Sequence, residues 1–207
     1  MIVRTPTIWD AKYIGLIALA LTSACSSGGA GVDPLNFATT QDAMDELGGL
    51  ISDIQSSGFV DTTTAELPTS GSVAYQGYLA IAGTDDTVAP ADDFLFAVGR
   101  LELTANFSGV GTIDGVADHF IDGSDAQMTG ELVVEVNNIG PAGDFTGQVD
   151  GMIINSDGFE YTYQVPVDGG FLGPSVDYMG AVGGGDFTDL GTNVVTPFGL
   201  VFVTERE

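Results

Sequence analysis

The stretch Gly169–Phe187, GGFLGPSVDYMGAVGGGDF, decides the fold of this chain. Seven of its nineteen residues are glycine and none is basic. This composition excludes an ordinary helix, because glycine is a poor helix former, and a nucleic-acid-binding patch, because such patches need basic side chains. Glycine within a strand pattern marks a bulge, a corner or a close backbone approach, and closed β-barrels need such points to bend tilted strands. The stretch therefore predicts the closing strands of a small β-barrel.

The residues from 71 onward alternate between apolar and polar side chains, the period-2 pattern of strands with one buried face. We expect eight strands, at residues 72–82, 100–107, 110–120, 131–136, 145–154, 159–167, 176–182 and 197–204. The run Asn155–Gly158 predicts a tight hairpin connection. Since no helical run of ten residues interrupts the series, we expect an all-β, eight-stranded antiparallel up-and-down barrel. A barrel of this size is filled by its own side chains or holds one small ligand.

Residues 40–58 predict one amphipathic helix before the barrel. Its apolar side chains recur at three- and four-residue intervals, at Ala43, Met44, Leu47, Leu50, Ile51 and Ile54. Gly48 and Gly49 each cost about 1 kcal/mol relative to alanine, so we expect the helix to depend on packing. It serves either as a plug or lid on the barrel or as a partner-binding arm.

Residues 1–24 predict a signal peptide, with basic residues ahead of the apolar run 14–21. Leu21–Cys25 resembles the lipobox of bacterial lipoproteins, in which the leader is cut before a cysteine that then becomes lipidated. The resemblance implies palmitate on Cys25 and anchorage to the outer membrane. The Ser- and Gly-rich composition after Cys25 predicts a flexible tether, within residues 25–39. Plain secretion and a membrane span are the alternatives, although a span needs about 20 apolar residues.

The chain is strongly acidic, with a net charge of −25, and after Cys25 its basic residues are Arg100 and Arg206. Such a surface repels nucleic acid and anionic lipid, so neither is an expected partner. Solubility, a saline habitat and complementarity to a basic partner remain three alternative explanations of the acidity.

Candidates for site chemistry are few. The single cysteine excludes an intramolecular disulfide. His119, the only histidine, is a surface or core histidine or else a general base or haem ligand. Four aspartates lie close together in the sequence, at Asp114, Asp118, Asp122 and Asp125. They are either ligands of a calcium ion or solvated acidic residues of a loop. No cofactor is expected, with haem or calcium as the alternatives, and an enzyme is the least favoured class.

Residues 68–207 resemble the β-barrel domain of transferrin-binding-protein-like bacterial surface lipoproteins. The motif residues that carry the resemblance are Tyr75, Gly77, Phe107, Gly115, Gly170, Phe171, Gly173, Pro174 and Gly180. The resemblance implies an eight-stranded barrel on the outer membrane that binds host proteins or haem carriers.

We therefore expect a non-enzymatic outer-membrane lipoprotein, displayed on the cell surface, whose barrel binds an extracellular protein or a small ligand. Two other functions remain open: a carrier of haem or a small molecule, with tyrosines and His119 reaching a pocket, and a structural envelope lipoprotein. A barrel inserted in the outer membrane is disfavoured, because the polar strand faces carry Glu and Gln rather than a lipid-facing apolar band.

Overall fold

The computed structural model describes residues 37–56, 62–83, 97–188 and 195–207, with side chains left out at 186–188 and 195–197. The predicted signal peptide, Cys25 and the predicted tether as far as residue 36 lie outside the described residues.

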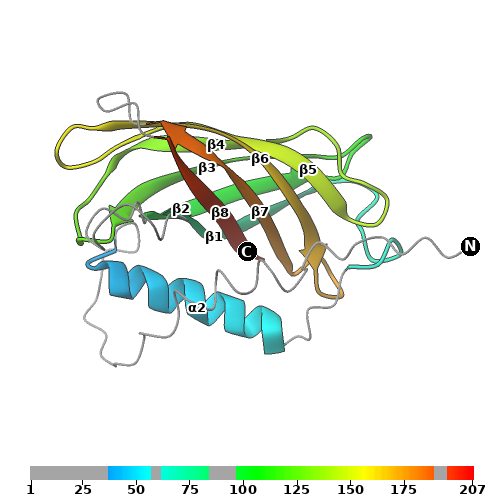
Figure 1. Cartoon of the computed structure of the whole chain (residues 1–207). Coiled ribbons are helices and arrows are strands. Elements are labelled where there is room, and N and C mark those ends of the chain that lie inside the picture. Colours follow the sequence, from blue (N-terminus) through cyan, green and yellow to red (C-terminus); the bar gives the residue numbers. More distant parts are fainter. Residues whose placement is uncertain (1–36, 57–61, 84–96, 189–194) are drawn as a thin grey trace, which may run out of the picture.

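The described residues form one helix followed by a closed barrel (Figure 1). The elements are α2 (Thr40–Ser56), β1 (Ser72–Gly83), β2 (Ala97–Asn106), β3 (Thr112–Asp122), β4 (Thr129–Val136), β5 (Asp144–Ile154), β6 (Glu160–Leu172), β7 (Tyr178–Thr188) and β8 (Val195–Arg206). Each strand pairs antiparallel with the next, and β8 pairs antiparallel with β1. The predicted all-β, eight-stranded up-and-down barrel is confirmed.

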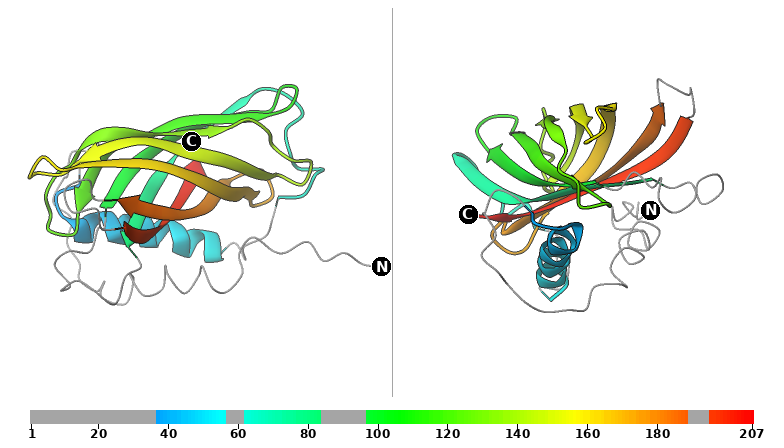
Figure 2. Two further views of the ribbon diagram at one scale, coloured as in Figure 1. Left: turned by 45° about the horizontal axis from the view of Figure 1, so that its top comes forward. Right: turned by 90° about the vertical axis from the view of Figure 1, so that its left-hand side faces the viewer.

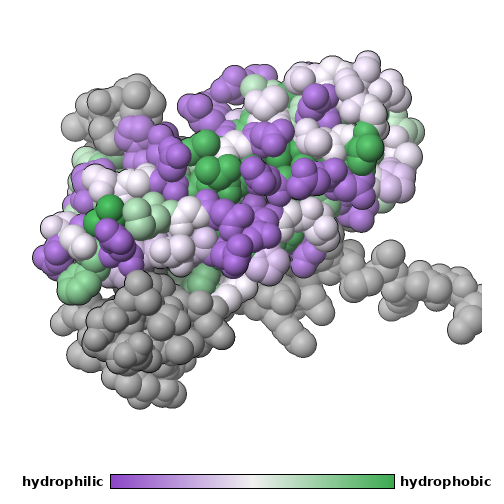
Figure 3. Space-filling model, turned by 90° about the horizontal axis from the view of Figure 1, so that it is seen from above, coloured by the Kyte–Doolittle hydropathy of each residue, from purple (hydrophilic) through white to green (hydrophobic). Residues whose placement is uncertain are grey.

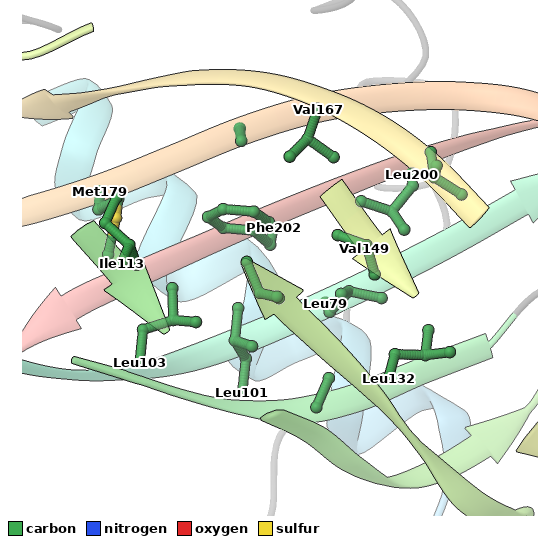
Figure 4. Packing of buried hydrophobic residues seen from close by; sticks show 14 of the residues in the cluster. Leu79, Leu101, Leu103, Ile113, Leu132, Val149, Val167, Met179, Leu200 and Phe202 are labelled. Carbon is green, nitrogen blue, oxygen red and sulfur yellow. The ribbon is translucent and has the colours of Figure 1, made fainter. Parts of the chain in front are cut away.

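The barrel interior is filled by the inward-facing side chains of all eight strands. Figure 4 shows them converging from opposite walls, with Leu101, Val149 and Phe202 each at most 1% exposed. Fully burying a side chain of this size contributes about 1.5–3 kcal/mol. The hydrophobic core of the protein is therefore the barrel lumen itself.

The alternation of β3 is interrupted by a bulge opposite Gly99. The register steps from Val98 to Arg100 on β2, and His119 on β3 has a φ of 52°. After this extra residue Phe120 points into the lumen and Ile121 points outward. The bulge thereby gives β3 buried side chains on both faces.

The outward side of β1, β2, β3 and β8 is covered by α2, which lies along the outside of the barrel (Figures 1 and 2). A second apolar cluster joins the helix to this wall. Its buried members are Phe37, Ala43, Leu47, Leu50, Ile51, Ile54, Ala80, Val98, Ile121, Leu172 and Val203. The expectation of a plug or lid is wrong, because the apolar stripe of α2 packs on the side wall of the barrel.

The start of α2 is fixed by a capping box. The Asp42 backbone N–H donates to Thr39 Oγ1 and the Thr39 N–H donates to Asp42 Oδ2, both over 3.1 Å. The helix is described as far as Ser56, and the predicted end at Gly58 lies outside the described residues.

Replacing Gly49 by alanine is expected to raise the free energy of unfolding by about 0.5–1 kcal/mol. Gly49 is exposed, and a Cβ there has no atom within 4 Å, so alanine adds helix propensity without a clash. The midpoint of thermal unfolding should shift upward by roughly 1–4 °C. A lowered midpoint would show that the glycine is needed for packing.

Candidate functional site

The predicted motif residues gather at one end of the barrel, which we call the capped end. Phe171, at the end of β6, lies at the centre of an aromatic cluster. Its ring centroid is 6.0 Å from that of Tyr75, 5.4 Å from that of Phe107 and 5.9 Å from that of Phe145. All four side chains are at most 7% exposed, so the cluster closes the lumen at this end.

The β6–β7 turn, residues 173–177, folds over this cluster. Gly173 has a φ of 86°, which favours glycine at that position. The Tyr75 hydroxyl donates to the Val176 carbonyl over 2.8 Å, and Arg206 Nη1 donates to the Ser175 carbonyl over 3.1 Å. Burial raises the pKa of the Tyr75 hydroxyl, which keeps it protonated as a donor. The turn is thus tied to β1 and β8.

The segment 62–71 also covers the capped end, which the sequence did not reveal. Thr62 is 2% exposed; its N–H donates to the Phe171 carbonyl over 3.1 Å and its hydroxyl to the Gly173 carbonyl over 2.7 Å. Leu67 packs against the core nearby. The motif around Phe171 therefore has a structural role, as the cap of the barrel.

The motif glycines lie where strands approach closely. A Cβ on Gly77 would overlap the Val203 carbonyl oxygen on β8, and one on Gly115 would overlap the Glu102 carbonyl oxygen on β2. Gly170 and Gly180 are direct cross-strand partners between β6 and β7. At Gly77 and Gly115 there is no room for a side chain. Gly170 and Gly180 lie where β6 and β7 pair near the capped end.

The four candidate calcium ligands do not converge. Asp114 lies on β3 opposite Thr104 and Asp118 lies opposite Arg100, well along the strand from each other. Asp122 accepts hydrogen bonds from Ser124 and Ala126 in the β3–β4 turn. Among the described residues no group of three or more His, Cys, Asp or Glu side chains is placed to hold a metal ion. The structure thus spreads the four aspartates along β3 and the β3–β4 turn.

Asp125 has a different role, at the start of α2. Its Oδ1 accepts the Thr40 N–H over 2.6 Å, and the Asp122 carbonyl accepts the Thr40 hydroxyl. A carboxylate at this place satisfies a free helix N–H and interacts favourably with the helix dipole. The β3–β4 turn therefore fixes the N-terminal end of the helix against the barrel.

His119 lies on the barrel surface. Its side chain is 35% exposed, and its Nδ1 is 2.6 Å from Asp118 Oδ1. The neighbouring Phe120 occupies the lumen instead. The His119 side chain is thus placed on the outside of the barrel, while the lumen position is taken by Phe120.

A cluster that we call the helix clasp, Phe37, Glu46, Tyr78 and Arg100, holds α2 to the wall. The Arg100 guanidinium lies 4.7 Å from the Phe37 ring centroid and 5.9 Å from that of Tyr78. Arg100 Nη2 is 3.8 Å from Glu46 Oε2, which also accepts the Tyr78 hydroxyl. Cation–π contact and charge pairing act together here. Sequence reasoning missed the clasp, although a lone arginine on a strand next to an acidic helix was a usable signal.

Raising the pH from about 9 to about 11.5 is expected to lower the stability of wild type more than that of Tyr78→Phe. Burial and the Glu46 hydrogen bond raise the pKa of Tyr78 from 10.0 to about 12. Stability linked to this hydroxyl is complete below its unfolded-state pKa and is lost as pH rises towards the folded value. Denaturant unfolding at both pH values checks this. Equal losses in the two proteins would contradict it.

The opposite end of the barrel, which we call the hairpin end, carries the β3–β4 turn and the β5–β6 hairpin. Tyr163 on β6 and Phe198 on β8 are buried just inside it, with their rings edge-to-face and their centroids 5.4 Å apart. The hairpin turn Asn155–Gly158 confirms the predicted tight connection: Asn155 and Phe159 close it by a 3.1 Å backbone bond, and Gly158 has a φ of 82°. Phe159 is 57% exposed at its tip.

The wall opposite α2 is polar on its outward face. Carboxylates lie along β4, β5 and β6 at Glu131, Glu135, Asp150, Glu160 and Asp168. Figure 3 shows this side of the molecule, with hydrophilic residues spread between smaller hydrophobic groups. Among the described residues no helix has the length and apolar character to cross a bilayer.

No protein-family model matches the sequence, and no curated protein matches it. Among solved structures, a tryptophan-to-alanine mutant of transferrin binding protein B from Haemophilus parasuis Hp5 is 19% identical, with a TM-score of 0.51 over 71% of this chain. Isotype 1 transferrin binding protein B from serogroup B Neisseria meningitidis is 16% identical, with a TM-score of 0.42 over 71% of this chain. This chain spans 28% of the length of each of those proteins. The described barrel thus has a transferrin-binding-protein-B-like fold, as the motif residues predicted.

Proposed function

We propose that this chain is a lipid-anchored protein of the bacterial outer membrane whose barrel binds an extracellular partner on the cell surface. The observation that carries the proposal is the lipobox-like run Leu21–Cys25 placed ahead of a closed barrel. The solved structures of similar fold are named as transferrin binding proteins, which supports a binding role. Several acyl chains on Cys25 would hold the chain at the membrane, at about 0.8 kcal/mol per buried methylene.

Binding through the outer surface is favoured over carriage inside the lumen. The lumen is packed with fully buried apolar side chains such as Leu79, Leu132 and Phe202. A ligand inside would have to displace them, at a cost of several kcal/mol. The turns and the outward strand faces are accessible without such repacking, so we assign the partner to them.

Binding is favoured over catalysis for a related reason. Four tyrosines have a raised pKa, each mainly because of burial: Tyr75, Tyr78, Tyr163 and Tyr178. Tyr75 holds the cap and Tyr78 belongs to the helix clasp, so the environments that shift them serve packing. A perturbed group points to a catalytic site only when it also faces a cleft with a charge partner.

The anchor is tested by growing cells on labelled palmitate and comparing wild type with Cys25→Ala. We expect label on the wild-type protein in the membrane fraction and an unlabelled variant in the soluble fraction. Ser26→Ala, which changes the adjacent residue and keeps the thiol, is the matched control and should retain the label. An immunoblot establishes equal expression. A labelled Cys25→Ala protein, or an unlabelled wild type at equal expression, would overturn the lipoprotein assignment.

A further inference from the structure

The β5–β6 hairpin presents an aromatic side chain from a rigid turn. Asn155 Oδ1 accepts the Asp157 N–H over 3.1 Å and the Phe159 N–H over 2.9 Å, which fixes the turn from within. Phe159 remains 57% exposed, and Met152 on the same hairpin is 37% exposed. In Figure 1 this hairpin is the yellow loop that projects from the barrel. An anchor held in place before binding loses little conformational entropy on association.

Exposed acidic residues flank these apolar residues along the chain and across the strand pair. Asp157 and Glu160 are exposed on the hairpin itself, and Glu131 on β4 is the direct cross-strand partner of Met152. The two arginines of the described residues are engaged elsewhere: Arg100 in the helix clasp and Arg206 with the Ser175 carbonyl at the capped end. The charge on the hairpin tip therefore has no cation of this chain beside it among the described residues.

The helix clasp shows how this protein holds a cation. It combines an aromatic ring 4.7 Å from the Arg100 guanidinium with a carboxylate 3.8 Å from it. The hairpin tip offers the same two kinds of group, Phe159 with Asp157 and Glu160, in an exposed position. An arginine or lysine of another protein can make a cation–π contact with such a ring and an ion pair with such a carboxylate.

We propose that the hairpin tip, residues 152–160, is a docking site for a basic segment of the partner protein, with Phe159 as its anchor. The inference rests on the proposed binding function and names the class of partner. Charge decides between the occupants: a second copy of this chain carries the same net charge of −25, and an anionic membrane surface is repelled in the same way. A basic segment is attracted instead, and its apolar side chains can pack on the exposed ring of Phe159.

The test is fluorescence anisotropy of a short fluorescein-labelled peptide of alternating arginine and leucine, titrated with the full-length protein. Phe159→Ala is expected to weaken binding about five- to tenfold, from loss of cation–π contact and apolar area. Val110→Ala is the matched control, because Val110 is 68% exposed at the capped end. It should bind within about twofold of wild type. Both positions are exposed, so both variants should fold, which circular dichroism verifies.

Three results would overturn the proposal. Equal affinity of Phe159→Ala and wild type would show that the peptide is held by the acidic surface at large. Equal binding of a glutamate–leucine peptide would show that charge does not select the partner. Dimerisation of wild type, with a monomeric Phe159→Ala variant, would show that the hairpin tip binds a second copy of this chain and not a basic segment. Failure of the palmitate experiment leaves these results unaffected, so the anchor and the docking site are tested separately.

Discussion

Replacing Gly77 by alanine is expected to lower the free energy of unfolding by about 3 kcal/mol, because it forces apart the two strands that close the barrel. A Cβ at this position would overlap the Val203 carbonyl oxygen and lie 2.6 Å from the Thr204 Cα. Both neighbours are backbone atoms of β8, so neither can move aside as a flexible side chain would. Denaturant unfolding of the purified protein measures the loss.

Gly83→Ala is the matched control for this experiment. Gly83 lies on the same strand and pairs with Phe198 of the same neighbour, β8, yet a Cβ there has no atom within 4 Å. We expect its stability to stay within about 0.5 kcal/mol of wild type. Equal effects of the two substitutions would contradict the close approach of β1 and β8 at Gly77.

Replacing Phe171 by alanine is expected to cost about 3–5 kcal/mol, the range for deleting a buried phenylalanine. Phe171 is 2% exposed and contacts the rings of Tyr75, Phe107 and Phe145, so its removal leaves a cavity under the cap. The thermal midpoint should fall by roughly 10 °C.

Phe159→Ala makes the same chemical change at an exposed site and is therefore the control for Phe171→Ala. Phe159 is 57% exposed, so its removal should change stability by at most about 0.5 kcal/mol. A Phe171→Ala protein that unfolds at the wild-type midpoint would show that the aromatic cluster does not close the barrel.

The strands were predictable from the sequence because each has one buried face. The alternation at Leu101, Leu103 and Ala105 matches the lumen side of β2 residue for residue. The glycine-rich stretch was harder, since glycine carries no such pattern: β6 continues to Leu172 and β7 to Thr188, beyond the predicted ends.

The apolar stripe of α2 was predicted correctly, but its position on the side wall of the barrel was not. Helix periodicity says which face is buried and nothing about what covers it. The missing signal is in the strands: Leu79, Ala80 and Ile81 form an unbroken apolar run, which indicates burial on both faces. Leu79 and Ile81 face the lumen and Ala80 faces the helix.

The four aspartates are kept apart for a geometric reason. Four residues along a strand span about 13 Å, at roughly 3.3 Å per residue, so Asp114 and Asp118 cannot ligate one ion from one strand. Asp122 and Asp125 belong instead to the turn that holds α2, a long-range contact with Thr40 that local spacing does not encode. The hairpin tip, in contrast, is local and was visible as a turn.

Protease treatment of intact cells, with an epitope tag after Glu207 and a parallel Cys25→Ala strain, tests the central claim most directly. The claim is that a lipid anchor displays this barrel outside the cell. We expect external protease to remove the wild-type tag, and the Cys25→Ala protein to be found in the periplasm or the medium. A tag that survives in intact cells and is cleaved only after permeabilisation would place the barrel inside the envelope and contradict the account.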